Sequence, residues 1–276
     1  MKFSVLMTTY AGESAENLDR SLSSIYEQQT LKPNQVVLVL DGFVGINLEE
    51  IVSKYNTQYP EIFTIVRLLT NIGQGLASQE GIKYCKYDLV ARMDSDDISC
   101  PERFALQIAT FEHMSDVDVV GGWTKEFDST PEDAISVRRL PETHNEIEKT
   151  FRYKNAINNV SVMFRRECLE RIGGYTAGRN GEDFRIYAKM LVAGCRFYNI
   201  QQVLVCVRIG EKMLIRRGNF NVFKSWVKNQ KILLNGKKTN MFHFLISCAA
   251  CFIFVKTPPK MKKLIYGILL RRKEFI

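Results

Sequence analysis

Short apolar runs alternate with helix-like segments from residue 3 to residue 122, and this alternation limits the possible folds more than any other feature of the chain. The apolar runs lie at 3–8, 35–40, 63–68, 88–93 and 117–122. Helical patterns separate them, near 14–28, 47–58, 75–86 and 102–114. The runs are apolar at nearly every position, so both faces of each strand should be buried. The sequence therefore predicts an α/β fold with a mostly parallel central sheet and helices on both faces.

Polar residues follow three of these strands where each strand ends. They are Thr8–Tyr10, Asp41 and Asp94–Asp97. Ligands of open parallel sheets bind beyond the carboxyl ends of the strands. We therefore expect one rim of the sheet to carry the chemistry.

The pattern becomes mixed after Gly122. Residues 160–175 are typical of a strand, a short helix and a Gly-Gly turn, and two further strands are expected near 196–200 and 203–207. Between them, a helix is predicted over 181–194. It opens with Glu182 and Asp183, where acids suit the positive end of the helix dipole.

The acidic cluster in "ARMDSDDI" (91–98) has the chemistry of a metal site. In an extended strand residues i and i+2 point to the same side, so Asp94 and Asp96 would converge. Two hard oxygen ligands favour Mg²⁺ or Mn²⁺, with the remaining ligands supplied by a substrate diphosphate. The alternative is a solvated turn that caps the helix beginning near Glu102. An EF-hand is excluded because Ser99 and Ala105 stand where Gly and Glu are needed.

Cysteine and histidine give no sign of a structural framework. The seven cysteines show no paired spacing across the body of the chain, and Cys248 and Cys251 form a CxxC without a second ligand pair. We therefore expect neither disulfides nor zinc, and a reducing cytoplasm. The histidines stand at no metal-ligand spacing.

The chain divides into an acidic body and a basic tail. Residues 1–207 hold 22 Lys and Arg against 28 Asp and Glu, whereas residues 208–276 hold 16 against 2. We expect one domain over 1–210 and a helical region over 211–276. The apolar run 244–255 is too short to span a membrane, but with its basic neighbours it fits an anchor on an anionic membrane surface. The alternative is a buried C-terminal helix. No nucleic-acid motif is present, so no nucleic-acid partner is expected.

Five segments together resemble the family 2 glycosyltransferases of GT-A fold, which are inverting enzymes that use nucleotide sugars. In order along the chain, these segments are "SVLMTTYAGES", "VVLVLDG", "NIGQGLASQEGI", "DSDDISCPERFALQ" and "GEDFRIYAKMLVAG". The resemblance covers roughly residues 3 to 210. "ARMDSDDI", "INNVSVMFRR" and "MLIRRGNF" are most similar to the branch that builds bacterial O-antigen and exopolysaccharide on a diphosphate-lipid carrier.

The resemblance implies a donor site. The residues it places around the nucleotide sugar are Thr8, Tyr10, Asp41, Asn71, Gly73, Asp94 and Asp97, with Asp94 and Asp96 as ligands of Mn²⁺ or Mg²⁺. A simple turn is the alternative for Asn71 and Gly73. A dinucleotide-binding motif is excluded at this turn because Ser78 stands where the third glycine is needed. A nucleotidyltransferase would need a Gly-rich, Arg-containing loop after the first strand, and this chain has none.

The resemblance also implies an acceptor side. The Glu182-Asp183 pair matches the family's catalytic base, and we favour Asp183; a plain helix start is the alternative. Arg208, Arg216 and Arg217 are expected to reach a diphosphate, with an exposed basic loop as the alternative. Relatives often have His-Pro where this chain has Asn159-Val160, which leaves the acceptor open.

The sequence thus predicts an inverting transferase that moves a hexose from a UDP-sugar to a lipid-linked saccharide at the cytoplasmic face of the inner membrane. A non-catalytic protein of the same fold and a transferase that uses a GDP- or dTDP-sugar are the alternatives.

Overall fold

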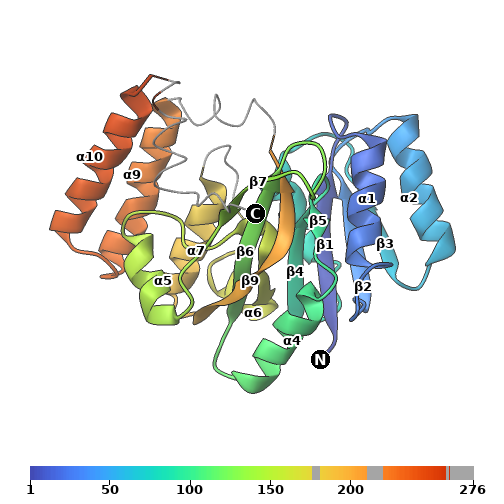
Figure 1. The fold of residues 1–276 in the computed structure, drawn as a ribbon, viewed down its shortest axis with the longest axis horizontal. Coiled ribbons are helices and arrows are strands. Elements are labelled where there is room, and N and C mark those ends of the chain that lie inside the picture. The colour runs from blue at the N-terminus through green and yellow to red at the C-terminus, as the bar shows by residue number, and fades with distance from the viewer. Residues whose placement is uncertain (176–180, 210–219, 259–260, 262–276) are drawn as a thin grey trace.

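In the computed structural model a curled, mostly parallel sheet forms the centre of the molecule, with helices around it (Figure 1). The structure describes residues 1–175, 181–209, 220–258 and 261. Its strands are β1 (Phe3–Thr9), β2 (Gln35–Leu40), β3 (Phe63–Arg67), β4 (Leu89–Asp94), β5 (Ile98–Ser99), β6 (Val119–Phe127), β7 (Ala134–Arg138), β8 (Met163–Arg165) and β9 (Phe197–Arg208). Its helices are α1 (Ala15–Ile25), α2 (Ile46–Gln58), α3 (Gln74–Ile82), α4 (Arg103–His113), α5 (His144–Phe151), α6 (Arg166–Arg171), α7 (Glu182–Val192), α9 (Phe220–Asn235) and α10 (Met241–Lys256), with a 3-10 turn at Asn159–Ser161.

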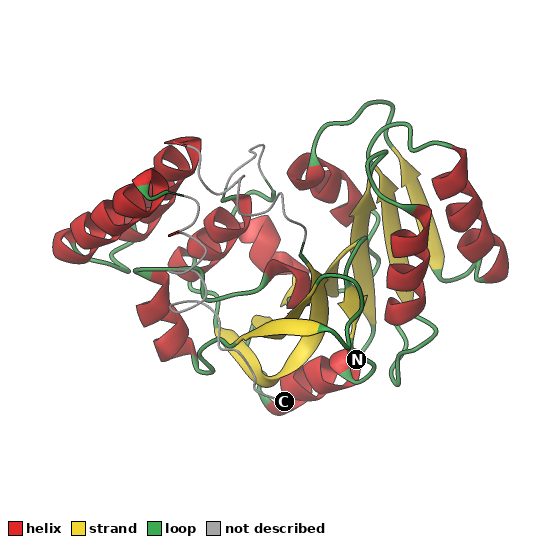
Figure 2. Cartoon of the chain, turned by 45° about the horizontal axis from the view of Figure 1, so that its top comes forward, coloured by secondary structure: helices red, strands yellow, loops and turns green. Residues whose placement is uncertain are grey.

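Both faces of the sheet are buried, as the unbroken apolar runs predict. In β1, Phe3, Val5 and Met7 join a core that includes residues of α1, α2 and α4. Leu6 points to the opposite face and joins a second core with residues of α3, α5, α7 and α9. Figure 2 shows the helices on the two sides of the strands. The predicted α/β fold class is confirmed.

The strand order brings the predicted polar rim together. Strands β3, β2, β1 and β4 lie side by side in that order and run parallel. Within this group Thr8 of β1 pairs with Asp94 of β4, and Thr9 pairs with Leu40, the last residue of β2. The carboxyl ends of these strands therefore meet at one edge. Beyond β4 the sheet continues through β8, which is antiparallel to both of its neighbours, to β6 and β9.

The second half of the chain departs from the prediction in several elements. The two strands expected near 196–200 and 203–207 form one strand, β9, whose pairing with β6 shifts register around Trp123. A shift of this kind lets a strand bend without ending. Strands β5 and β7 and helix α5 were not anticipated. Helix α5 nevertheless begins with a capping box between Thr143 and Glu146, a signal that the sequence carries.

Where the structure describes the tail it is helical, and α9 packs against the body. Leu233 of α9 is fully buried in the core, and the Trp226 ring lies 4.9 Å from the ring of Phe184 in α7. Helix α10 rests on α9, where the indole N–H of Trp226 donates to Ser247 at 3.0 Å. Within the described residues, no helix has both the length and the apolar character needed to cross a bilayer.

Candidate active site

The acidic cluster begins at the carboxyl end of β4. Asp94 is the last residue of this strand and lies beside Thr8 of β1, which is buried. The Ser21 hydroxyl of α1 donates to the Asp94 carbonyl oxygen at 3.0 Å. The backbone that carries Asp94 is thus held by the sheet on one side and by a helix on the other.

Two donors hold the Asp94 carboxylate, and both act on the same oxygen. Arg92 Nη2 lies 3.1 Å from Oδ1, and Gln74 Nε2, at the start of α3, lies 2.8 Å from it. Arg92 is 2% exposed, whereas the Asp94 side chain is 25% exposed. Both residues lie on one face of β4 because they are two positions apart. The pair therefore joins a buried cation to a carboxylate that reaches solvent.

Asp96 does not lie in β4. The expectation that an extended strand directs Asp94 and Asp96 to the same side is therefore wrong. The strand ends at Asp94, and Asp96 sits in the turn that follows. The two carboxylates still interact: burial, with Asp94 and Glu13 nearby, raises the pKa of Asp96 to about 6. Crowded carboxylates of this kind favour a bound cation or proton.

The Asp97 carboxylate is directed into the protein. This residue is 2% exposed, and its Oδ1 accepts the backbone N–H of Arg208 at 2.9 Å. Burial, together with Asp96 and Asp94, raises its pKa well above the usual range. The bond ties the acidic turn to the end of β9. Contact of Asp97 with a donor stays a prediction.

Asp41 organises the turn that contains Asn71 and Gly73. Its two carboxylate oxygens accept the backbone N–H groups of Ile72 at 2.7 Å and Gly73 at 2.9 Å, and it is 4% exposed. The next residue, Gly42, has φ +86°, and a Cβ there would lie 2.7 Å from the Asn71 nitrogen. The structure thus brings the predicted Asp41, Asn71 and Gly73 together, with the carboxylate holding the turn.

Tyr10 is the first residue after the end of β1. It follows the strand and is 51% exposed, so its ring is open to a stacking partner. A Cβ at Gly12 would lie 2.5 Å from that ring, so a larger residue there would displace the Tyr10 side chain. A base-stacking role for Tyr10 stays a prediction.

Helix α7 presents Glu182 and Asp183 in its first turn. Burial, and the neighbouring Asp183, raise the pKa of Glu182 to about 7. The helix starts after Gly181, which has φ +68°, and Asn229 of α9 holds this start by donating to the Gly181 carbonyl at 2.8 Å. Arg185 Nε donates to the Oδ1 atom of the same Asn229 at 3.2 Å. A tail helix thus fixes the acidic turn of α7.

The acidic turn of α7 and the end of β4 are electrostatically connected through Arg92. Burial acts to lower the pKa of this arginine, but Asp94, Tyr175, Asp183 and Tyr187 outweigh burial and raise it. Asp94 and Asp183, which are far apart in the sequence, thus act on the same buried arginine.

Asn159 belongs to the same region. It accepts the hydroxyl of the fully buried Tyr187 at 2.7 Å. Tyr187 lies one turn into α7, so Asn159 is linked to the helix that carries the predicted base.

Arg208 lies at the end of β9 beside the acidic turn. Its guanidinium donates to the carbonyls of Asp128 at 3.1 Å and Ser129 at 3.4 Å and lies over the Phe127 ring. Its charge acts to lower the pKa of Asp96, so it is within electrostatic range of the cluster. The other two predicted diphosphate residues, Arg216 and Arg217, lie outside the described residues.

The residues at the β4 end fit a divalent cation. Both donors to Asp94 act on Oδ1, and within the described part of the chain no hydrogen bond to Oδ2 is found. Asp96 supplies a second carboxylate whose raised pKa reflects the local negative charge. Hard oxygen donors of this kind suit Mg²⁺ or Mn²⁺.

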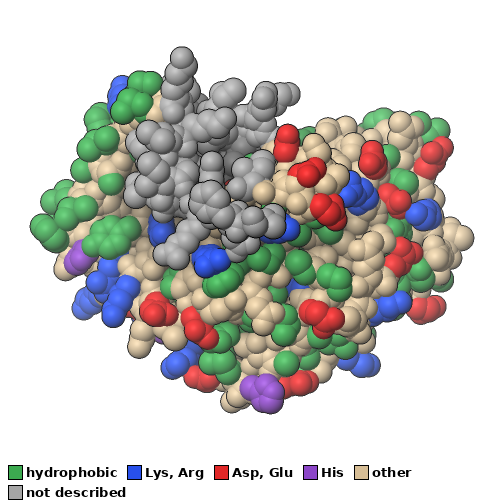
Figure 3. Space-filling model, viewed as in Figure 1, with side chains coloured by type: hydrophobic (Ala, Val, Ile, Leu, Met, Phe, Trp, Pro, Cys, Tyr) green, Lys and Arg blue, Asp and Glu red, His purple; other side chains and the backbone are tan. Residues whose placement is uncertain are grey.

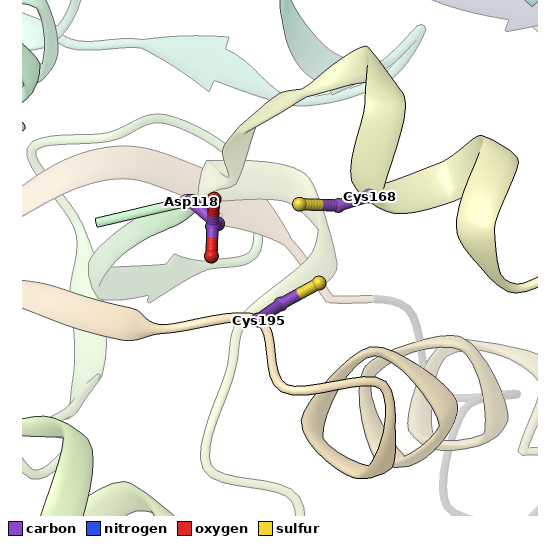
Figure 4. Close-up of side chains that lie close together, drawn as sticks. All are labelled: Asp118, Cys168 and Cys195. Carbon is purple, nitrogen blue, oxygen red and sulfur yellow. The ribbon is translucent and has the colours of Figure 1, made fainter. Parts of the chain in front are cut away.

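A different cluster lies at the opposite edge of the sheet. Asp118, Cys168 and Cys195 have potential ligand atoms within 4.8 Å of one another (Figure 4). Asp118 precedes β6, and its Oδ2 already accepts the backbone N–H of Arg196 at 2.8 Å. Both cysteines are fully buried, and the Cys168 thiol donates to Cys195, which lowers the pKa of Cys195. The cluster is therefore a packed thiol pair beside a satisfied carboxylate, remote from the acidic rim.

Sequence reasoning missed Arg92 and Gln74. The signal for Arg92 was present: an arginine inside the apolar run 88–93 must be buried with a partner, and Asp94 is two positions along on the same face. Gln74 carried no such signal, because its contact with Asp94 depends on how α3 packs against the sheet.

The fold, the acidic end of β4 and the acidic start of α7 together define a glycosyltransferase of GT-A fold. A family model described as "Glycosyl transferase family 2" matches residues 4–173, and the chain belongs to this family.

Two relatives from bacteria are similar over nearly the whole chain. The amylovoran biosynthesis glycosyltransferase AmsE of Erwinia amylovora is 35% identical, over 88% of this chain and 91% of the relative. The UDP-Gal:alpha-D-GlcNAc-diphosphoundecaprenol beta-1,3-galactosyltransferase of Escherichia coli is 32% identical, over 98% of this chain and 97% of the relative.

Solved structures share the fold at lower sequence identity. S. aureus TarS 1–349 in complex with UDP-GlcNAc has a TM-score of 0.69 and 18% identity, covering 98% of this chain and 76% of TarS. The mannosyltransferase PcManGT from Pyrobaculum calidifontis, in complex with GDP-Man and Mn²⁺, has a TM-score of 0.62 and 16% identity, covering 96% of this chain and 79% of that one.

Proposed function

We propose that this glycosyltransferase moves a hexose, with inversion, from a UDP-sugar to a lipid-linked saccharide during synthesis of a bacterial surface polysaccharide. The observation that carries the proposal is that two acidic groups, one at the end of β4 and one at the start of α7, interact with one arginine. Asp94, held by one oxygen at the end of β4, and Asp183, at the start of α7, act on the same buried arginine. This arrangement supports a donor site at Asp94 and a base at Asp183.

The donor side is supported by the rim of β1, β2 and β4. Tyr10 offers an exposed ring, and the Asp41-bound turn offers the backbone of Asn71 and Gly73 beside it. Asp94 and Asp96 would hold Mn²⁺ or Mg²⁺, which when bound offsets the negative charge of the leaving diphosphate. UDP as the nucleotide follows the names of the E. coli relative and of the TarS complex. A GDP-sugar is the alternative favoured by the PcManGT complex.

The acceptor side needs a base. The acceptor hydroxyl attacks the anomeric carbon as the bond to the UDP oxygen breaks, and its proton passes to a carboxylate. We assign this role to Asp183, since its charge faces Arg92 and hence the end of β4. Glu182, with a pKa of about 7, is the internal alternative, because a base works best when its pKa is near the operating pH.

The acceptor class follows from the relatives. The E. coli relative is named for a diphosphoundecaprenol-linked acceptor, and AmsE for amylovoran biosynthesis. We propose that Arg208, at the end of β9, contributes positive potential near an acceptor diphosphate, together with Arg216 and Arg217.

The outer face of α10 is the surface by which we propose the enzyme meets the membrane. Large apolar residues at helical spacing are exposed along it, and Figure 3 shows hydrophobic side chains gathered at this end of the molecule. They are Met241, Phe242, Leu245, Ile246, Phe252 and Ile253. The 16 Lys and Arg against 2 acids from residue 208 onward match an anionic lipid surface. We propose the cytoplasmic face of the inner membrane as the partner of this surface, since a lipid-linked acceptor would lie there too.

The proposed activity is tested by release of UDP from a panel of UDP-sugars, with GDP- and dTDP-sugars included. We expect metal-dependent release from at least one UDP-sugar, its loss in excess EDTA, and its recovery with Mn²⁺ or Mg²⁺. Asp96→Ala should abolish the metal-dependent turnover. Full activity of the parent in EDTA would show that the metal assignment is wrong, and no release from any donor would favour a non-catalytic sugar-nucleotide-binding protein.

A further inference from the structure

Arg92 is a buried charge whose placement the fold alone does not explain. It is 2% exposed in the middle of the sheet, and its Nε has no hydrogen-bond partner among the described residues. A charge removed from water is tolerated only when it is paired, and its loss leaves the partner unpaired. Among the residues that the structure describes, the carboxylate in contact with Arg92 is that of Asp94, at 3.1 Å.

The contact acts on one oxygen of Asp94 and leaves the other available. Arg92 donates to Oδ1 from inside the sheet, and Gln74 donates to the same Oδ1 from the exposed start of α3. With both donors on one oxygen the carboxylate cannot rotate without losing two bonds. Groups that bind a ligating carboxylate in this way orient it for the metal.

Arg92 also interacts electrostatically with the other half of the site. Asp183 of α7 and the buried phenols of Tyr175 and Tyr187 act electrostatically on its guanidinium. Gln74 is bonded to Asp94 from the solvent side. Of the two donors to Oδ1, Arg92 is therefore the one whose charge also interacts with Asp183 of α7.

We propose that Arg92 is a positioning residue that turns Oδ2 of Asp94 toward the divalent cation and fixes the metal carboxylate relative to the α7 carboxylates. The inference rests on the proposed function, and it assigns to Arg92 a role beyond holding the fold. A purely structural arginine would affect stability and leave cation binding unchanged.

The chain offers a matched control for burial. Arg103 of α4 is also fully buried, but its guanidinium is bonded to the carbonyls of Arg92 and Val162 and to Gln107 instead of to a carboxylate. Arg103→Lys should therefore cost stability without changing cation affinity. Arg92→Lys keeps the charge, and Arg92→Met removes it while filling similar space.

The test measures Mn²⁺ binding to the full-length protein in the presence of UDP, by the EPR signal of free Mn²⁺, beside melting temperature and turnover. We expect Arg92→Met to weaken Mn²⁺ binding about tenfold or more, as losing such a supporting contact commonly does. Arg92→Lys should recover part of the loss. Arg103→Lys should bind Mn²⁺ as the parent does. Parent-like Mn²⁺ affinity in Arg92→Met, or an equal loss in Arg103→Lys, would overturn the proposal.

Gln74→Ala keeps the test decisive if the Arg92 variants do not fold, because Gln74 is exposed. It should weaken Mn²⁺ binding by a smaller factor, and saturating Mn²⁺ and donor should restore its kcat. Where Arg92→Met folds, its kcat should stay several-fold low under the same saturation. Unchanged Mn²⁺ affinity in Gln74→Ala would overturn the proposal that the donors to Oδ1 orient the Asp94 carboxylate. Absence of both Mn²⁺–UDP binding and turnover in the parent would instead overturn the proposed function itself.

Discussion

At the residue scale, burial gives two carboxyl groups of the site pKa values above those of ordinary surface acids. It raises the pKa of Asp96 to about 6 and that of Glu182 to about 7, in each case with a neighbouring aspartate adding to the effect. A carboxylate with a pKa near neutrality can take up a proton at working pH, but its ionised form is costly to the fold. Both consequences can be measured at the start of α7.

Asp183→Asn tests the base directly. Asn is nearly isosteric with Asp but cannot accept the acceptor's proton, so transfer should fall at least about a hundredfold. Affinity for the UDP-sugar should be almost unchanged because the predicted nucleotide contacts lie outside α7. Single-turnover transfer to acceptor and donor binding are the measurements. We expect Glu182→Gln to cost less, and the reverse order would move the base to Glu182. Full transfer activity in both variants would show that the Glu182-Asp183 pair is only the start of a helix.

Glu182 also makes stability depend on pH. Its folded pKa is raised, so the stability it contributes is fully present below its usual value of 4.5 and is lost as the pH rises through about 7. Glu182→Gln removes this loss. The melting temperature of the metal-free variant should therefore match the parent near pH 4.5 and exceed it above pH 7. Parallel curves across this range would show that Glu182 is solvated like an ordinary surface acid.

At the element scale, α9 joins the tail to the catalytic helix. Asn229, 2% exposed, bonds to the Gly181 carbonyl just before the two acids of α7. The adjacent Gln230, also buried, bonds to the Phe151 carbonyl of α5. The two amides therefore hold α9 to different neighbours.

Asn229→Ala and Gln230→Ala form a matched pair. Each should lower the free energy of unfolding by about 1 kcal/mol, because each removes a hydrogen bond made by a buried side-chain amide. Only Asn229→Ala should also lower kcat, since it releases the turn that carries Glu182 and Asp183. Denaturant unfolding and transfer assays measure the two effects. Equal kcat values for the two variants would mean that α9 does not position α7.

At the scale of the whole molecule, one end carries the chemistry and another presents an apolar surface. The outer face of α10 exposes Phe242 and Ile253 to about two thirds of their area. The basic residues beyond it add electrostatic attraction to anionic lipid, which salt screens. Apolar insertion and electrostatic attraction should therefore be separable.

A chain ending at Lys238 should lose membrane binding and keep UDP binding, because α9 and its core contacts remain. Sedimentation with anionic vesicles at low salt measures the partition. The full-length variant Leu245→Glu/Ile253→Glu keeps the basic tail, so it should bind more weakly than the parent and be released more fully by about 1 M salt. If the truncated and full-length chains bind equally at low salt, α10 and the residues after it are not the anchor.

The fold class and the position of the site were determined by the sequence itself. Strands buried on both faces leave an unbroken apolar run, and their polar ends had to meet at one edge, as the pairing of Thr8 with Asp94 shows. The Asp94–Asp97 cluster and the Glu182-Asp183 pair could also be identified in the sequence. Acidic residues grouped beside an apolar run are expected to have a structural or binding role. These features are local, since each is written within a few neighbouring residues.

The features that only the tertiary structure decided are contacts between segments that are distant in the sequence. It placed Asp41 on the backbone of its neighbouring turn, buried Asp97 against Arg208 and merged two expected strands into β9 alongside β6. It also brought Gln74 and Arg92 onto one oxygen of Asp94. Such contacts depend on strand order and helix packing, which long-range burial selects. A local pattern shows that a charge must be paired, but the packed fold decides with which partner.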